Sequence, residues 1–283
     1  MMRLYDIRLG QVTDIEPARR RLLRLAVTGT DQEPGTIHCA GPAGLAGPAG
    51  RAHLGDLRTY LVGDLIRRNA ERRNLVVQAS HSASRADGAE LGLRPPDEAR
   101  LDGPVDIQVG GSEPGDLARH WTAAGPVLFD EPAPGEPPAG EPPPAGERPP
   151  GERRPGELGG SVRLDDLAER GLDPLALRLA FLRHPYRDEL RLSWAALTAA
   201  QQALQAIRAH VADWATRPSR PLSASHAAQV HAAFDDDLAT PRALATLREL
   251  AGSTQVPPGA KFETFAHLDQ LLGLDLAREI GRY

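Results

Sequence analysis

The sequence contains one cysteine, Cys39, and one lysine, Lys261, among its 283 residues. A single cysteine excludes an internal disulfide and any zinc site built from several cysteines, and it fits a reducing compartment. The other 32 of the 33 basic residues are arginines. A catalytic lysine is therefore available only at position 261.

Aromatic residues make up only 4% of the chain, and no apolar run approaches the length that spans a bilayer. The core must therefore be built from Leu, Val and Ala, and no membrane partner is expected. The net charge of −5 provides no overall attraction to nucleic acid or anionic lipid. Because Met1 to Gly10 lacks the apolar stretch of a signal peptide, a cytoplasmic protein is expected.

A run rich in glycine, alanine and proline begins at Cys39 and ends in His53-Leu54-Gly55-Asp56. Its repeated Ala-Gly-Pro triplets disfavour helix and strand, so we expect a loop. The apolar residues from Leu57 to Leu65 follow helical spacing and predict a helix that starts near Asp56, with Asp56 as its N-cap. A loop that feeds a helix N-terminus can bind a phosphate, but it is also ordinary helix capping, and no Walker loop or G-x-G-x-x-G run is present.

Apolar and β-branched runs on both sides of this loop and helix predict an α/β fold. Strands are predicted over 3–8, 22–27, 75–79, 105–109 and 126–129, and a short helix over Asp116 to Ala124. The order strand, loop, helix, strand predicts a crossover in a parallel sheet. Ligands of such sheets bind at the carboxyl ends of the strands.

Proline, glycine and glutamate dominate residues 131–160, which predicts an extended linker or a disordered, exposed loop rather than a domain. After it, apolar stripes predict helices over 164–169, 173–182, 193–214 and 240–250, typical of a helical bundle. The sequence thus predicts a Rossmann-type α/β domain over 1–130, a linker over 131–160 and a bundle over 161–283.

Five short motifs follow one another along the chain: Arg3-Leu4-Tyr5-Asp6, His53-Leu54-Gly55-Asp56, Val105-Asp106-Ile107 with Gly110-Gly111, Leu175 to Tyr186-Arg187 with Leu192-Ser193, and Phe234 to Leu244. In this order they resemble the cysteinyl-tRNA synthetase family of class I aminoacyl-tRNA synthetases, and its relative, the cysteine ligase of mycothiol biosynthesis. The second motif stands where that family has His-Ile-Gly-His, and the last is similar to its Asp-Asp-Asp-Phe-Asn-Thr-Pro-x-Ala-Leu signature.

The resemblance implies a Rossmann-type nucleotide-binding domain followed by a helical bundle. It also implies the formation of an acyl adenylate from ATP and an amino acid, with Mg²⁺ as the accompanying ion. The residues that it assigns to nucleotide binding are His53, Gly55, Asp56, Gly110, Gly111 and Ser161.

The sequence departs from the family at positions that carry chemistry. Asp56 replaces the second histidine and places a carboxylate where phosphates would approach. No lysine occupies the place of the Lys-Met-Ser-Lys-Ser loop, where Ser161 is the one remnant and Arg153 and Arg154 are the nearby basic residues.

The family's zinc ligands, two cysteines, a histidine and a glutamate, are also incomplete. Cys39 with His38 or His120 forms at most a partial set, and a lone buried cysteine is the commoner explanation. Zinc is therefore not expected.

Two functions from different classes stay open. The favoured one is a cysteinyl-tRNA synthetase-like pseudoenzyme that is retained as a nucleotide-binding or regulatory module, with a small-molecule or protein partner. tRNA is not an expected partner, because no anticodon-binding extension follows the bundle. The alternative is an active ATP-dependent ligase that activates an amino or carboxylic acid and transfers it to a small amine, with arginines in place of lysines.

Overall fold

The computed structural model describes residues 1–29, 54–81, 85–98, 101–110, 118–129, 162 and 164–282, with the side chains of 85–87 excepted. Its central sheet has four parallel strands in the order β4-β3-β5-β6. These strands are β3 (Leu22–Thr28), β4 (Val76–His81), β5 (Val105–Gly110) and β6 (Ala118–Thr122). The predicted α/β class with a parallel sheet is confirmed.

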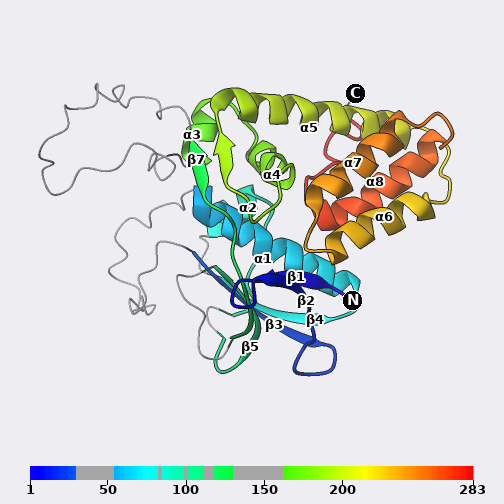
Figure 1. The fold of residues 1–283 in the computed structure, drawn as a ribbon. Helices are drawn as coiled ribbons and strands as arrows, with labels where there is room; N and C mark the ends of the chain where they lie inside the picture. Colours follow the sequence, from blue (N-terminus) through cyan, green and yellow to red (C-terminus); the bar gives the residue numbers. More distant parts are fainter. Residues whose placement is uncertain are drawn as a thin grey trace, which may run out of the picture.

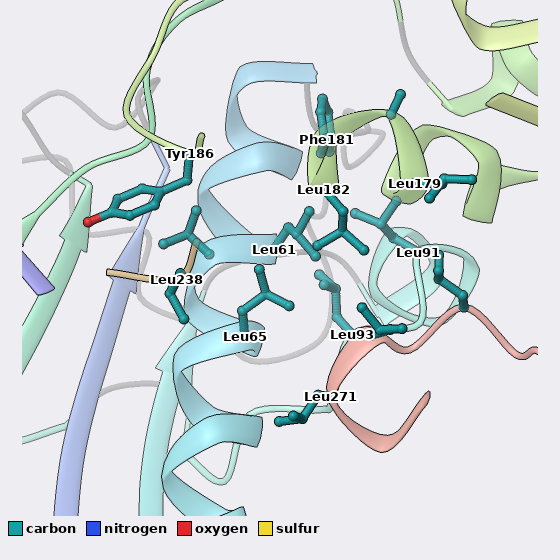
Figure 2. Close-up of a cluster of buried hydrophobic side chains, with 14 of the residues drawn as sticks. Leu61, Leu65, Leu91, Leu93, Leu179, Phe181, Leu182, Tyr186, Leu238 and Leu271 are labelled. Carbon is teal, nitrogen blue, oxygen red and sulfur yellow. The ribbon is translucent and has the colours of Figure 1, made fainter. Parts of the chain in front are cut away.

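Helix α1 (Leu54–Arg72) connects β3 to β4 and lies between the sheet and the helices of the second half (Figure 1). Fourteen of its 19 residues are buried, because both sides of the helix are covered. On the sheet side, a Cβ at Gly63 would come within 2.4 Å of Val27, so glycine allows the close approach of helix and strand. On the other side, Leu61 and Leu65 face Leu182 in the buried cluster of Figure 2.

Helices form most of the second half, as the apolar stripes predict. They are α3 (Leu164–Glu169), α4 (Pro174–Leu182), α5 (Trp194–Ala215), α6 (Ala224–Asp235), α7 (Thr240–Gly252) and α8 (Pro258–Leu272), while α2 (Arg85–Glu90) lies between β4 and β5. The sequence analysis missed α2, α6 and α8. None of the helices in the described ranges combines the length and apolar character that a membrane span requires.

Two small sheets flank the central one. Strand β1 (Arg3–Asp6) pairs antiparallel with β2 (Gln11–Asp14), a strand that the sequence analysis did not predict. Strand β7 (Val127–Phe129) was predicted, but its partner is β8 (Leu190–Leu192), which lies about 60 residues further along the chain. The Pro/Gly/Glu-rich segment 131–160 lies outside the described residues.

The helix predicted over Asp116 to Ala124 is wrong, because β6 occupies this part of the chain. Ala118, His120 and Thr122 are buried while the residues between them are more exposed, which is the two-residue period of a strand. The parallel pairing with β5 satisfies the backbone groups of the segment. Because this segment pairs with a distant strand, its short-range pattern alone did not predict the pairing.

The largest buried hydrophobic cluster extends from β3 through α1 and α4 to α8. The helices of the second half therefore share their core with the sheet. The domain boundaries at 130 and 160 fall in the part of the chain that the structure does not describe and stay a prediction.

A buried ion pair joins these elements. The Arg178 guanidinium on α4 is fully buried and donates to the Asp64 carboxylate of α1 over 2.7 Å. Arg178 also donates to the Leu272 carbonyl at the end of α8 (2.6 Å) and to the Leu91 carbonyl (3.1 Å). A second arginine, Arg68, donates to the same Asp64 oxygen over 2.7 Å. Four segments thus meet at Asp64 and Arg178.

We expect Arg178→Met to lower the free energy of unfolding by about 3 kcal/mol or more, because it leaves buried carbonyl groups and part of the Asp64 charge without a partner. Arg217→Met is the matched control, since the Arg217 to Asp213 pair is exposed on both sides and should contribute less than about 1 kcal/mol. Urea unfolding followed by circular dichroism measures both changes. Equal losses in the two variants would contradict the role assigned to Arg178.

Candidate functional site

The candidate site lies at the carboxyl edge of the central sheet, where the first turn of α1 meets the ends of β3 and β5. Of the residues that the resemblance assigns to nucleotide binding, Gly55, Asp56 and Gly110 are described. His53, Gly111 and Ser161 lie outside the described residues, as do Arg153 and Arg154.

Gly110, the last residue of β5, has a positive φ of 78°. A Cβ at this position would lie 2.2 Å from the Thr28 carbonyl oxygen and 2.8 Å from Cγ2 of Thr59. Its own carbonyl accepts a hydrogen bond from the Trp121 indole over 3.0 Å. Both the backbone conformation and the close packing therefore require glycine here.

Gly29 brings β3 close to the start of α1 in the same way. A Cβ at Gly29 would lie 2.8 Å from Oδ1 of Asp56 and 2.8 Å from the Tyr60 hydroxyl. The Asp56 carboxylate is therefore directed at the carboxyl end of β3, and Asp56 is only 5% exposed. The structure thus brings Asp56 and Gly110 to the same edge of the sheet.

The prediction that Asp56 is the N-cap of this helix is wrong. The helix begins at Leu54, so Asp56 belongs to its first turn. The reason is that Leu54 and Leu57 are both fully buried, and a helix that starts two residues earlier places both in the core. A carboxylate in the first turn still interacts favourably with the helix dipole.

Gly55 differs from the other two glycines of the site. A Cβ added to Gly55 would meet no atom within 4 Å, so this side of the first turn borders open space. An approaching ligand could contact the backbone here without displacing a side chain of the described residues. This is the accessible part of the candidate site.

Gly29, Thr59 and Tyr60 belong to the site, but sequence reasoning did not select them. Tyr60 falls within the stretch predicted as a helix, and Gly29 lies two residues beyond the predicted strand 22–27. The one signal in the sequence was this glycine just after a predicted strand, because parallel sheets bind their ligands at the carboxyl ends of the strands.

The first two turns of α1 contain one basic residue, Arg58, and it is directed away from Asp56. Its guanidinium is buried and donates to the carbonyls of Gly125 (3.0 Å), Asp188 (2.6 Å) and Pro185 (2.8 Å). Burial lowers the pKa of Arg58 to about 10, which leaves it charged at neutral pH. Arg58 thus holds the neighbouring loops together.

Three of the family-like motifs meet around Asp237, in the turn between α6 and α7. Its Oδ1 accepts from the backbone amide of Tyr5 and from the Tyr186 hydroxyl, each over 2.8 Å, and its Oδ2 pairs with Arg187 over 2.9 Å. Asp237 and Leu238 both have positive φ, so the turn is held in an uncommon conformation. These motifs therefore form a structural junction.

The neighbouring Asp235 connects the same turn to the end of α1. Its carboxylate pairs with Arg72 over 2.7 Å and with Arg73 over 2.8 Å, and Asn69 donates to it over 3.2 Å. The triple aspartate of the signature thus positions α6 against α1.

The metal hypothesis involved Cys39 with His38 or His120, and the first two lie outside the described residues. His120 is buried, and both of its ring nitrogens have protein partners: Nε2 contacts the Tyr5 carbonyl (3.2 Å) and Nδ1 contacts the Thr13 hydroxyl (3.3 Å). Burial lowers the pKa of His120, which favours a neutral ring. The described residues contain no group of three or more potential metal ligands.

Alanine substitutions at two glycines of the site are expected to change the stability of the protein in opposite directions. We expect Gly110→Ala to destabilise the protein by about 2 kcal/mol or more, because of its positive φ and the 2.2 Å contact with Thr28. Gly55→Ala should stabilise α1 by up to about 1 kcal/mol, since its Cβ meets open space in a helix. Thermal unfolding of the two variants compares them directly, and destabilisation by Gly55→Ala would show that this side of the helix is packed.

No family model matches the chain. Part of the chain is similar to curated proteins that are named ligases. It is 40% identical over 118 residues to cysteine–tRNA ligase 1 of Burkholderia lata, which covers 42% of this chain and 24% of that protein. It is 36% identical over 125 residues to the cysteine–tRNA ligase of Novosphingobium aromaticivorans, which covers 42% of this chain and 25% of that protein.

A second kind of ligase matches to a similar degree. The L-cysteine:1D-myo-inositol 2-amino-2-deoxy-alpha-D-glucopyranoside ligase of Thermomonospora curvata is 36% identical over 124 residues, covering 42% of this chain and 29% of that protein. The matched part spans about a quarter of the length of these relatives. The resemblance that the motifs indicate is confirmed: over about two fifths of its length, this chain is similar to cysteine–tRNA ligases and to the cysteine ligases of the second kind.

Proposed function

We propose that this protein is a cysteine–tRNA ligase-like module that binds a nucleotide at the carboxyl edge of its sheet and has lost amino-acid activation. The observation that carries this proposal is the position of Asp56, whose buried carboxylate faces the end of β3. In the family that the motifs resemble, a histidine stands here and stabilises the phosphates of ATP.

The charge of Asp56 opposes phosphate binding. A negative phosphate oxygen at 4 Å would be repelled by about 1 kcal/mol in water and by about 4 kcal/mol at the effective dielectric constant near a protein surface. The absence of lysines before Val162 removes further positive charge from the expected place of the mobile loop.

The remaining geometry supports nucleotide binding without catalysis. Gly29 and Gly110 keep the ends of β3 and β5 close to α1, and Gly55 leaves the first turn of the helix accessible. Amide groups at a helix N-terminus favour an anion at this point. The expected ligand is ATP or a similar nucleotide; tRNA and zinc are not expected, and a protein partner is compatible with a regulatory role in the cytoplasm.

The second candidate function is an active ATP-dependent ligase. In this case the Asp56 carboxylate would bind a metal ion. A Mg²⁺ ion between the carboxylate and the phosphates would turn the repulsion into an attraction, since Mg²⁺ is commonly held by one or two carboxylates and by substrate phosphates. The similar proteins are named as ligases, which favours the same candidate.

Substitution of Asp56 separates the two candidates. We expect Asp56→Asn to bind ATP in the presence of Mg²⁺ about fivefold to tenfold more tightly than the wild type, because it removes a repulsion of about 1 kcal/mol or more. Asp56→His should bind at least as tightly as Asp56→Asn. Isothermal titration calorimetry gives the affinities.

Asp14→Asn on the exposed strand β2 is the control for the change of one charge, and it should leave the affinity unchanged. Weaker binding by Asp56→Asn would show that Asp56 holds a metal ion and would favour the ligase. No detectable ATP binding by any variant would contradict a nucleotide site altogether.

A further inference from the structure

A cavity of about 310 Å³ is lined by residues of α4, α5, α7 and α8 and of the segments that follow α4 and α8. Figure 1 shows these four helices together in the second half of the chain. Eleven of the 14 lining residues of the cavity are apolar, and the three others are basic. Leu179, Leu247 and Phe265 contribute to its apolar wall, and the basic residues are Arg183, His210 and Arg248. The volume is at the lower end of the range of small-molecule sites.

No carboxylate among the residues that the structure describes lines this cavity. In the described part of the chain, neither the Arg183 nor the Arg248 guanidinium takes part in a salt bridge or a side-chain hydrogen bond, although Arg183 is half-buried. Both arginines line the same cavity, and burial together with the neighbouring Arg248 charge lowers the pKa of Arg183.

The buried arginines of the described residues have acidic or carbonyl partners. Arg178 pairs with Asp64, and Arg208 pairs with Asp173 over 2.7 Å. The guanidinium of Arg58 donates to three carbonyls. The guanidinium groups of half-buried Arg183 and exposed Arg248 instead lie beside an apolar cavity without such partners among the described residues. A bound anion would offset their mutual repulsion and would take the place that a carboxylate has elsewhere.

We propose that this cavity binds a small amphipathic carboxylic acid. Its apolar body lies against Leu179, Leu247 and Phe265, and its carboxylate lies between Arg183 and Arg248. The guanidinium geometry suits a carboxylate, which accepts paired hydrogen bonds from it. None of the residues of the proposed nucleotide site lines this cavity, so the second site is independent of the first.

The test compares octanoate with 1-octanol, which has the same chain length and no charge. We expect calorimetry to detect octanoate binding to the wild-type protein below 1 mM, and the double variant Arg183→Gln/Arg248→Gln to bind octanoate at least about tenfold more weakly. Binding of 1-octanol should not change in this variant. Arg220→Gln, an exposed arginine outside the cavity, is the control and should bind octanoate as the wild type does.

A second variant fills the cavity without removing charge. Ala251 of α7 lines it, and Ala251→Phe should abolish binding of both probes while circular dichroism confirms the helical fold. Three results would overturn the proposal: no octanoate binding by the wild type at millimolar concentration, equal losses of octanoate and 1-octanol in the double arginine variant, or normal binding by a folded Ala251→Phe protein.

Discussion

The fold depends on the buried pair of Asp64 and Arg178, because this pair is where the sheet half and the helical half of the chain are joined. Asp64 is on α1, which packs against β3 on one side, and Arg178 is on α4. Desolvation alone would raise the pKa of the buried Asp64 carboxyl, yet Arg178 and Arg68 together hold that pKa below its ordinary value. The carboxylate is therefore charged in the native state, and its partners must stay in place.

Several other polar side chains of α1 also hold neighbouring segments against this helix. Arg58 holds the loops around 125 and 185–188, and Asn69 and Arg72 contact Asp235 at the end of α6. This explains why the motifs most similar to the ligase family are structural here. Their side chains fix the bundle on α1, and their retention says little about whether the chemistry of the family is retained.

The first turn of α1 differs from the rest of the helix. Gly55 borders open space, and Asp56 faces the end of β3 where a phosphate would approach. The nucleotide fold is kept by packing that involves Gly29, Gly63 and Gly110, whereas the charge at the site has the opposite sign from that of a phosphate-binding histidine. Retention of the fold and loss of the reaction are thus compatible, because they depend on different residues.

Local patterns were sufficient to predict β3, α1, β5 and the helices α4, α5 and α7, since each has a regular apolar period of its own. They were insufficient for β6 and for the pairing of β7 with β8, which depend on partners far along the chain. The resemblance directed attention to Asp56 and Gly110, and the structure brings both to one edge of the sheet. Gly29 and Tyr60 were missed because their importance lies in the closeness of β3 to α1, which no short stretch of sequence contains.

Amino-acid-dependent exchange of pyrophosphate into ATP tests the loss of activation most directly. The 283-residue chain would be assayed with Mg²⁺ and each of the twenty amino acids, with an active cysteine–tRNA ligase as the positive control. The account predicts that no amino acid raises exchange above the background without amino acid. Exchange that depends on cysteine, or on any other amino acid, would show that an acyl adenylate forms and would contradict it.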